Sequence, residues 1–314
     1  MLAYARSKAA IKNNYMNYSH IRTNSKQFKA LTSMSVEEFD LLLPRFEAEW
    51  ENYIERYTLS GKPRTRKYSP KDEQDLSSSE EKLFFILYAL KNNPLQQALA
   101  ASFSLKQEMA NQWFHLLEGL LNKALKAFAP QRNWVKINAI LQEDQTYLLD
   151  ATERPIPRDT YQQEEFFSGK KKRHTLKNLL LLSLVGTIVF LSTTVSGKCA
   201  NKTLAQQELR IQKPIQLYAD LAFKALPAEQ FTLILPHKKP RNKELTKIQK
   251  TQNRLISGIR VKVENHFAHL KVLRIIKDVC PNYKFNFRNN IIDTACRLHN
   301  FRIDQRIKRL TFCL

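Results

Sequence analysis

Hydrophobic residues in the first third of the chain recur at the spacing of amphipathic helices. Ser35 and Glu38 form a capping-box pattern ahead of an apolar series, which predicts a helix over residues 35–56. Ser78 and Glu81 repeat this pattern at the start of a second predicted helix. The buried stripe of the second helix is expected at Leu83, Ile86, Leu87 and Leu90.

Two more helices are predicted before residue 127. A short helix over residues 95–101 is followed by a tight turn and a longer helix capped by Ser104. The longer helix has its expected buried stripe at Leu105, Met109, Trp113, Leu116 and Leu120. This succession is typical of a helix-turn-helix module, and an ordinary helical hairpin is the alternative. Side chains expected to face outward and reach a major groove are Lys106, Gln107, Ala110 and Asn111.

The hydrophobic pattern changes to that of strands after residue 145. Strands are predicted over residues 146–150, 176–183 and 187–195, the last two joined by a hairpin at Val185–Gly186. A helix, two further strands ending at Asp220 and Leu235, and a helix carrying Glu264 follow. The predicted fold class is α+β. It comprises an all-helical module over residues 1–127, a linker over 128–145, and a ribonuclease H-like mixed-sheet domain over 146–314.

The charge of the chain indicates its partner. Lys and Arg total 51 against 29 Asp and Glu, a formal net charge of +22. Such an excess favours a polyanion, because Lys and Arg displace the counterions condensed on phosphates. The pattern therefore predicts nucleic-acid binding, with a basic RNA-binding protein as one alternative to a DNA-binding one.

Cysteine usage and hydropathy indicate the compartment. Cys199, Cys280, Cys296 and Cys313 form no CxxC pair, which is typical of reduced thiols inside a cell. The longest apolar stretch, residues 179–191, is shorter than the ~20 residues of a membrane span. We therefore expect no membrane association. The expected location is a reducing compartment inside a cell.

Three acidic residues are candidates for a metal site. Asp150 and Asp220 each end a short apolar strand, and Glu264 lies in an otherwise basic and apolar helix. If the two strands are neighbours, both Asp side chains emerge at one sheet edge, where Glu264 could complete the site. Three carboxylates are the ligands that two Mg²⁺ ions need, with Mn²⁺ as a substitute. The alternative is that the Asp residues serve as strand-end caps or ion-pair partners.

Two basic segments are candidate DNA contacts. The first precedes the predicted hairpin beside Phe166 and Phe167, and a solvated sheet edge is the alternative reading for it. The second is a proline-stiffened loop over residues 236–241. The candidate DNA-binding side chains in the catalytic domain are Lys170, Lys171, Lys172, Arg173, His174, Lys177, His237, Lys238, Lys239, Arg241 and Arg260.

Several segments resemble the successive signatures of DDE-type insertion-sequence transposases with an N-terminal helix-turn-helix. They include "LLDATERPI" at 148–156, "YADLAF" at 218–223 and "NRLISGIRVKVENHFAHLKVLRI" at 253–275. The resemblance runs from about residue 27 to residue 303 and is closest to the group named after insertion sequence five. The family's three acids fall on Asp150, Asp220 and Glu264.

The resemblance implies Mg²⁺-dependent nicking at transposon ends, followed by strand transfer from the freed 3′-hydroxyl. It also implies double-stranded DNA as the partner, both transposon ends and target, and a homodimer or larger assembly on DNA. The location it implies is the cytoplasm of a bacterium, at the nucleoid, or the nucleus of a eukaryote. Ala151 and Asn201 depart from the family pattern, which commonly has a Gly and an acid there. The alternatives are therefore a domesticated, catalytically inactive DNA-binding derivative and a metal-dependent nuclease without strand transfer.

Overall fold

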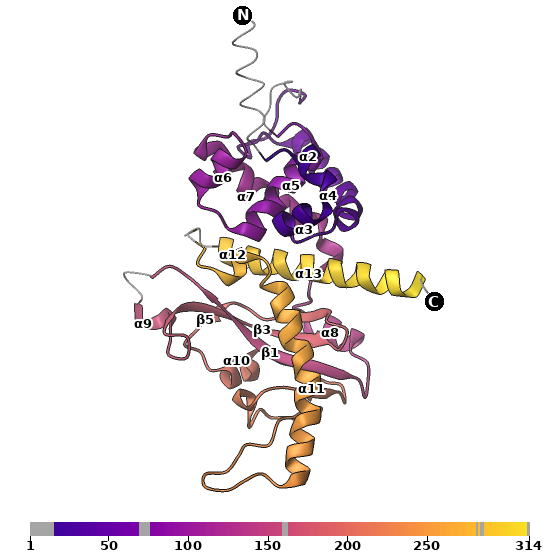
Figure 1. Cartoon of the computed structure of the whole chain (residues 1–314), viewed down its shortest axis with the longest axis vertical. Coiled ribbons are helices and arrows are strands. Elements are labelled where there is room, and N and C mark those ends of the chain that lie inside the picture. Colours follow the sequence, from indigo (N-terminus) through magenta and orange to yellow (C-terminus); the bar gives the residue numbers. More distant parts are fainter. Residues whose placement is uncertain (1–15, 69–75, 159–162, 281, 283–285, 313–314) are drawn as a thin grey trace, which may run out of the picture. The chain divides into compact units, whose positions relative to one another are not determined.

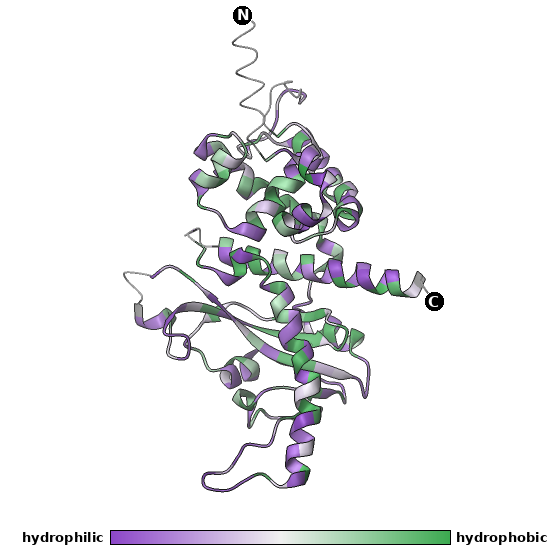
Figure 2. Ribbon diagram, viewed as in Figure 1, coloured by the Kyte–Doolittle hydropathy of each residue, from purple (hydrophilic) through white to green (hydrophobic). Residues whose placement is uncertain are grey.

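Helices form the first part of the chain in the computed structural model shown in Figure 1, which describes residues 16–68, 76–158, 163–280, 282 and 286–312. Both predicted capping boxes are confirmed, at the start of α4 (Val36–Arg56) and of α5 (Ser79–Asn92). The predicted buried stripe of α5 is also confirmed. Figure 2 shows α5 as one of the more hydrophobic helices, because it forms the centre of its bundle.

Helix α7 (Gln107–Ala124) differs from the prediction at its start and in its buried face. Lys106, not Ser104, is the N-cap, and Ser104 instead adopts a left-handed conformation with φ 57° in the turn after α6 (Gln96–Ser102). Ala110 is fully buried rather than outward-facing, whereas Met109 is 36% exposed. The apolar residues of α7 allow two stripes one position apart, and contact with α4 and α5 selects the one through Ala110, Trp113 and Leu117.

The chain divides into two compact units. The first contains residues 1–127, and residues 272–275 and 284–294 also belong to it. Aromatic packing fills its core, where the rings of Phe28 and Phe39 lie 5.3 Å apart. The start of α13 (Phe287–Phe312) is held to α7 by polar contacts: Thr294 Oγ1 donates to Glu118 Oε1 at 2.7 Å. A segment distant in sequence is therefore part of the helical unit.

A mixed sheet forms the core of the second unit, in the order β2-β3-β1-β6-β7, with β4 and β5 also paired to β3. The β3–β4 hairpin is confirmed, and Gly186 turns it with φ 100°. The strands are β1 (Thr146–Pro155), β2 (Phe167–Ser168), β3 (Arg173–Ser183), β4 (Ile188–Leu191), β5 (Val195–Ser196), β6 (Gln216–Tyr218) and β7 (Thr232–Ile234). The chain is thus a mixed helix-and-sheet protein with an N-terminal helical region, as its sequence predicts.

Helices complete the second unit. Residues 128–145, expected as a linker, contain α8 (Trp134–Ile140), whose Trp134 ring lies 4.8 Å from that of Phe190 in β4. The long α11 (Lys247–Leu270) contacts β1 and β6. The helices of the whole chain not yet named are α2 (Tyr18–Thr23), α3 (Ser25–Thr32), η1 (Lys126–Phe128), α9 (Gln163–Phe166), α10 (Asn201–Glu208), η2 (Leu221–Phe223) and α12 (Arg274–Lys277). Among the described helices, none has the length and apolar character to cross a membrane.

Candidate active site

Asp150, within β1, and Asp220, just after β6, lie at equivalent positions relative to the parallel pairing of these two strands. Strand β1 pairs with β6 in parallel, and the last aligned pair is Leu148 with Tyr218. Each aspartate therefore lies two residues beyond that pair. Because adjacent strands are about 4.8 Å apart, and residues two apart on a strand share a face, both carboxylates emerge together at one edge. The strand ending at Asp220 is followed directly by η2.

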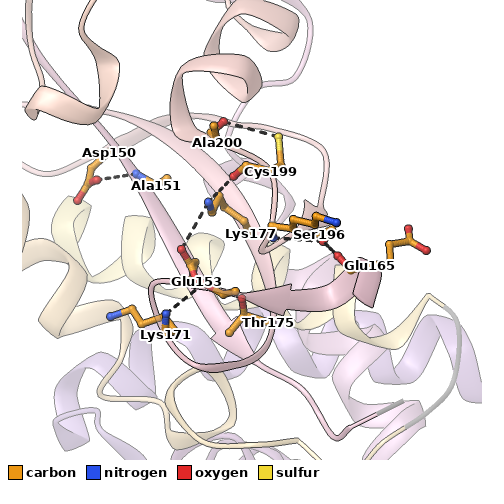
Figure 3. Close-up of polar contacts among 12 residues, drawn as sticks. Asp150, Ala151, Glu153, Glu165, Lys171, Thr175, Lys177, Ser196, Cys199 and Ala200 are labelled. Atoms are coloured by element: carbon orange, nitrogen blue, oxygen red, sulfur yellow. Dashed lines mark hydrogen bonds and ion pairs between the residues drawn. The ribbon is translucent and has the colours of Figure 1, made fainter. Parts of the chain in front are cut away.

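One backbone hydrogen bond orients each carboxylate. Asp150 Oδ1 accepts the N–H of Ala151 at 2.7 Å (Figure 3), and Asp220 Oδ1 accepts the N–H of Ala222 at 2.7 Å, capping η2. Among the described residues, no other hydrogen bond reaches either carboxylate. Each acid therefore keeps one oxygen available as a hard ligand, the kind that Mg²⁺ prefers.

Burial is the main influence on the pKa of Asp150. It raises the pKa of the Asp150 carboxyl to about 6, and the nearby charge of Asp220 acts in the same direction. The Ala151 N–H and the cations Arg260 and Lys271 oppose this rise. Two carboxylates held close together in a half-buried place favour a bound cation, because a cation relieves both their repulsion and their desolvation. The chemistry of this pair therefore fits a divalent metal ion.

Helix α11 supplies the charges that face this pair. At about 100° per residue, Arg260, Glu264 and Lys271 fall within an arc of about 40° on the helix. This charged stripe borders the buried stripe of Val263, Phe267 and Leu270, through which α11 packs in its own unit. Asp150 and Glu153 raise the pKa of the Lys271 ammonium, while burial, the largest influence, and Lys171 lower it. Glu264 thus lies on the same side of α11 as two cations that act on Asp150.

The structure does not gather the three acids into one cluster. Glu264 is exposed, and within the described parts of the chain no three His, Cys, Asp or Glu side chains are close enough together to hold a metal ion. Asp150 and Asp220 are the pair that the fold brings together, and Glu264 is near them only through its helix face. Carboxylates repel one another, and a cation is what draws such a set together.

Lys177, a candidate DNA contact in the sequence, is buried in the structure. It lies in β3, which is paired on both sides, and only 4% of the residue is exposed. Its Nζ is 3.4 Å from Glu153 Oε1 and donates to the carbonyl of Cys199, while Thr175 donates to Glu153 Oε2 at 3.1 Å (Figure 3). Lys177 therefore neutralises a buried carboxylate three residues beyond Asp150 on β1.

Replacing Lys177 by Met is expected to destabilise the fold. The substitution leaves the Glu153 carboxylate buried without its cation, which costs about 3–5 kcal/mol. Urea unfolding of the two proteins measures the loss. Lys170→Met, at an exposed position, is the matched control and should change stability by no more than about 0.5 kcal/mol. Equal unfolding midpoints for Lys177→Met and the wild type would show that the ion pair contributes nothing.

The other predicted DNA contacts lie on exposed surfaces, apart from Asn111, His174 and Arg260, which are half-buried. Lys170, Lys171, Lys172 and Arg173 lie at the start of β3 or just before it. In the loop before α11, the backbone N–H of His237 donates to Asn253 Oδ1 at 2.7 Å, and Lys239 pairs with Glu244. Figure 2 shows this loop as mostly hydrophilic. Sequence reasoning missed Lys271, although its spacing of seven from Glu264 places both on one helix face.

Comparison with known proteins shows what the second unit resembles. Residues 149–300, which include all three acids, match the family described as DDE superfamily endonuclease. The chain is 23% identical over 216 residues to the probable transposase for insertion sequence element IS702 of Microchaete diplosiphon, an alignment covering 68% of this chain and 78% of that protein. No solved structure gives a significant match. Both comparisons support the resemblance seen in the sequence: residues 149–300 match the family of DDE superfamily endonucleases, and the chain is similar to a probable insertion-sequence transposase.

Proposed function

We propose that this protein binds the terminal inverted repeats of a transposon, nicks the DNA there with the help of Mg²⁺, and joins the freed end to target DNA. The observation that carries the proposal is the pair of Asp150 and Asp220, each two residues beyond the last aligned residues of the parallel strands β1 and β6. The pair lies within the segment that matches the DDE endonuclease family. The net charge of +22 provides the attraction to a phosphate backbone.

The sheet supports a ribonuclease H-like assignment for the second unit. Strand β1 is antiparallel to β3 and parallel to β6, and β6 is parallel to β7. This order places Asp150, within β1, beside Asp220, just beyond the carboxyl end of β6. Ligands bind beyond the carboxyl ends of strands in open sheets with helical crossovers. Helix α11 follows the last strand and contacts both β1 and β6. The arrangement therefore positions acids from two strands and one helix around a common edge.

Asp150 and Asp220 would hold the metal, with Glu264 as the third ligand. Bound Mg²⁺ supplies activation of a water or sugar hydroxyl and stabilisation of the leaving oxygen. In this scheme Arg260 and Lys271 neutralise the non-bridging oxygens of the scissile phosphate, because they are the cations that act on Asp150. Lys170, Lys171 and Lys172 bind the flanking backbone. A protein handling two transposon ends is expected to act as a homodimer or a larger assembly.

We also propose that α6 and α7 form the DNA-reading part of the first unit. Helix α6 and helix α7 contact one another and are joined by a short turn. Phe103 in that turn packs 4.9 Å from the ring of Phe85 in α5, which supports the pair from behind. Gln107 is exposed and Asn111 is half-buried, and Gln96 links them through contacts of 3.5 and 3.1 Å. Amide side chains of this kind pair with adenine edges in a major groove.

Replacing Gln107 and Asn111 together by Ala should reduce discrimination between end DNA and random DNA. A bidentate amide–base pair contributes about 1–3 kcal/mol of discrimination, so a loss of about 5-fold or more is expected. Competition binding at fixed salt measures it, because affinity on DNA depends strongly on salt. Gln27→Ala, an exposed amide on α3, serves as the control. Unchanged discrimination in the double variant would mean that α7 does not read the sequence.

Nicking of a duplex that contains the transposon end, by purified protein with Mg²⁺, tests the catalytic proposal. Products joined to a target plasmid separate a transposase from a nuclease that only cuts. A second candidate function is a transposase-derived DNA-binding protein without catalysis, and the exposed, ungrouped position of Glu264 favours it. Specific binding of end DNA with neither nicks nor joined products would select this second function.

A further inference from the structure

A basic cavity lies at the end of the sheet remote from Asp150. Its volume is about 900 Å³, within the size range of small-molecule and nucleotide sites. It is formed by β2, the turn into β3, the start of β3 and the segments around residues 158 and 198. The lining residues are Arg158, Glu164, Phe167, Gly169, Lys172, Arg173, His174 and Lys198.

The cavity presents an aromatic surface to solvent. Phe167 is 41% exposed, and its ring lies 5.8 Å from that of His174 in an edge-to-face arrangement. The two residues are held opposite one another because Phe167 of β2 pairs with His174 of β3 in antiparallel register. An exposed aromatic ring held rigidly by strand pairing is a stacking platform for a planar ring, and a nucleobase gains about 1–3 kcal/mol by such stacking.

The charges around this platform fit a nucleotide rather than a neutral aromatic molecule. Among the described residues that line the cavity, Arg158, Lys172, Arg173 and Lys198 carry positive charge and Glu164 carries a carboxylate. Cations beside an aromatic face are the combination with which proteins hold single-stranded nucleic acid, the cations for the backbone and the ring for the base. The Glu164 carboxylate can accept a hydrogen bond from an exocyclic base amine, as carboxylates do from cytosine.

We propose that this cavity holds an unstacked nucleotide of the DNA strand on which the enzyme acts. The inference rests on the proposed function and adds a subsite to it. The backbone N–H of Ile156 donates to the carbonyl of His174 at 3.0 Å, so His174 lies beside the far end of β1. Six residues of strand separate Ile156 from Asp150, a span of roughly 20 Å. About six nucleotides at 3.4 Å each cover this distance, which places the unstacked base that far from the cleaved bond.

The test measures binding of a short fluorescein-labelled DNA strand to the full-length protein over a series of salt concentrations. Phe167→Ala should weaken binding by about 5- to 150-fold at every salt concentration without changing the salt slope, because stacking is lost and no charge is. Phe167→Trp should keep the affinity. Lys172→Gln should instead reduce the salt slope by about one. Tyr57→Ala, which removes an equally exposed aromatic ring (41%) from the other unit, is the control and should leave binding unchanged.

Wild-type protein that fails to bind the strand, or Phe167→Ala that binds like the wild type, would overturn the proposal. Thermal unfolding of each variant checks that the exposed substitution leaves the fold intact. Failure of this subsite and failure of the proposed function give different results. If the protein nicks DNA with Mg²⁺ but Phe167→Ala binds the strand as the wild type does, the subsite is rejected and the proposed function stands. If Phe167→Ala weakens strand binding but the wild type nicks no DNA, the catalytic proposal is rejected and the subsite stands.

Discussion

Asp150→Asn should abolish Mg²⁺-dependent nicking while leaving DNA binding intact. The substitution replaces a charged ligand by a neutral amide in the pair with Asp220, and a metal contributes several kcal/mol to such a transition state, so a loss of about 1,000-fold or more is expected. Glu143→Gln is the matched control, because Glu143 precedes the same strand and pairs with Lys213 at the surface. Nicking that survives in Asp150→Asn would show that the site lies elsewhere.

The same variant should be more stable than the wild type. Burial first, and then Asp220, raise the pKa of Asp150 to about 6 from 3.8, so the folded state holds this proton more tightly than the unfolded state. Stability therefore falls as pH rises from about 4 to about 6, and the ionised carboxylate costs the fold about 2–3 kcal/mol at neutral pH. Asn carries no charge and avoids this cost. Urea unfolding at pH 7 should show the gain, and equal or lower stability would contradict the assigned pKa.

The raised pKa of Asp150 also predicts the pH dependence of activity at limiting Mg²⁺. A metal ligand must be deprotonated, so protons compete with the ion below the pKa of the carboxyl. The nicking rate should fall about tenfold for each pH unit below about 6. Above about pH 7 the rate should not depend on the ionisation of Asp150. Saturating Mg²⁺ should move the fall to lower pH. A profile unaffected by Mg²⁺ concentration would assign the titration to another group.

Glu264→Gln should reduce nicking by about 100- to 1,000-fold, the usual effect of removing one group that stabilises a transition state. Glu264 lies on the stripe of α11 that carries Arg260 and Lys271, both of which act on Asp150. Binding of DNA should change little, because the substitution removes no positive charge. Glu244→Gln, an exposed acid in the loop before α11, is the control.

Full activity in Glu264→Gln would mean that Glu264 stays exposed during the reaction and does not bind the metal ion. The site would then consist of Asp150 and Asp220 alone. Joined products made by the variant would extend that conclusion from nicking to strand transfer.

Local signals in the sequence predicted the helices well. The capping boxes at Ser35 and Ser78 are short-range patterns, and the fold preserves them. The buried face of α7 could not be predicted in the same way, because two overlapping apolar stripes fit the sequence. Packing against α4 and α5 decides between them, and that contact is not visible in any local window.

The candidate site shows the same division between local and long-range information. The apolar residues predicted strands that lead to Asp150 and Asp220, but β1 continues past Asp150 to Pro155, and β6 ends at Tyr218. The parallel pairing of these strands joins segments about 70 residues apart. Lys177 resembled its exposed neighbours in sequence, and only the central place of β3 shows that it neutralises Glu153. Which residues of α11 form the charged stripe beside Asp150 depends on which face of the helix packs against the sheet. Lys271 was missed because the sequence does not show that face.

Binding of Mn²⁺, followed by electron paramagnetic resonance, tests most directly whether Asp150 and Asp220 form a metal site. We expect the wild type to bind the ion, and Asp150→Asn and Asp220→Asn each to weaken binding by about tenfold or more, with Glu143→Gln unchanged. Wild-type affinity for Mn²⁺ in both aspartate variants would contradict the account.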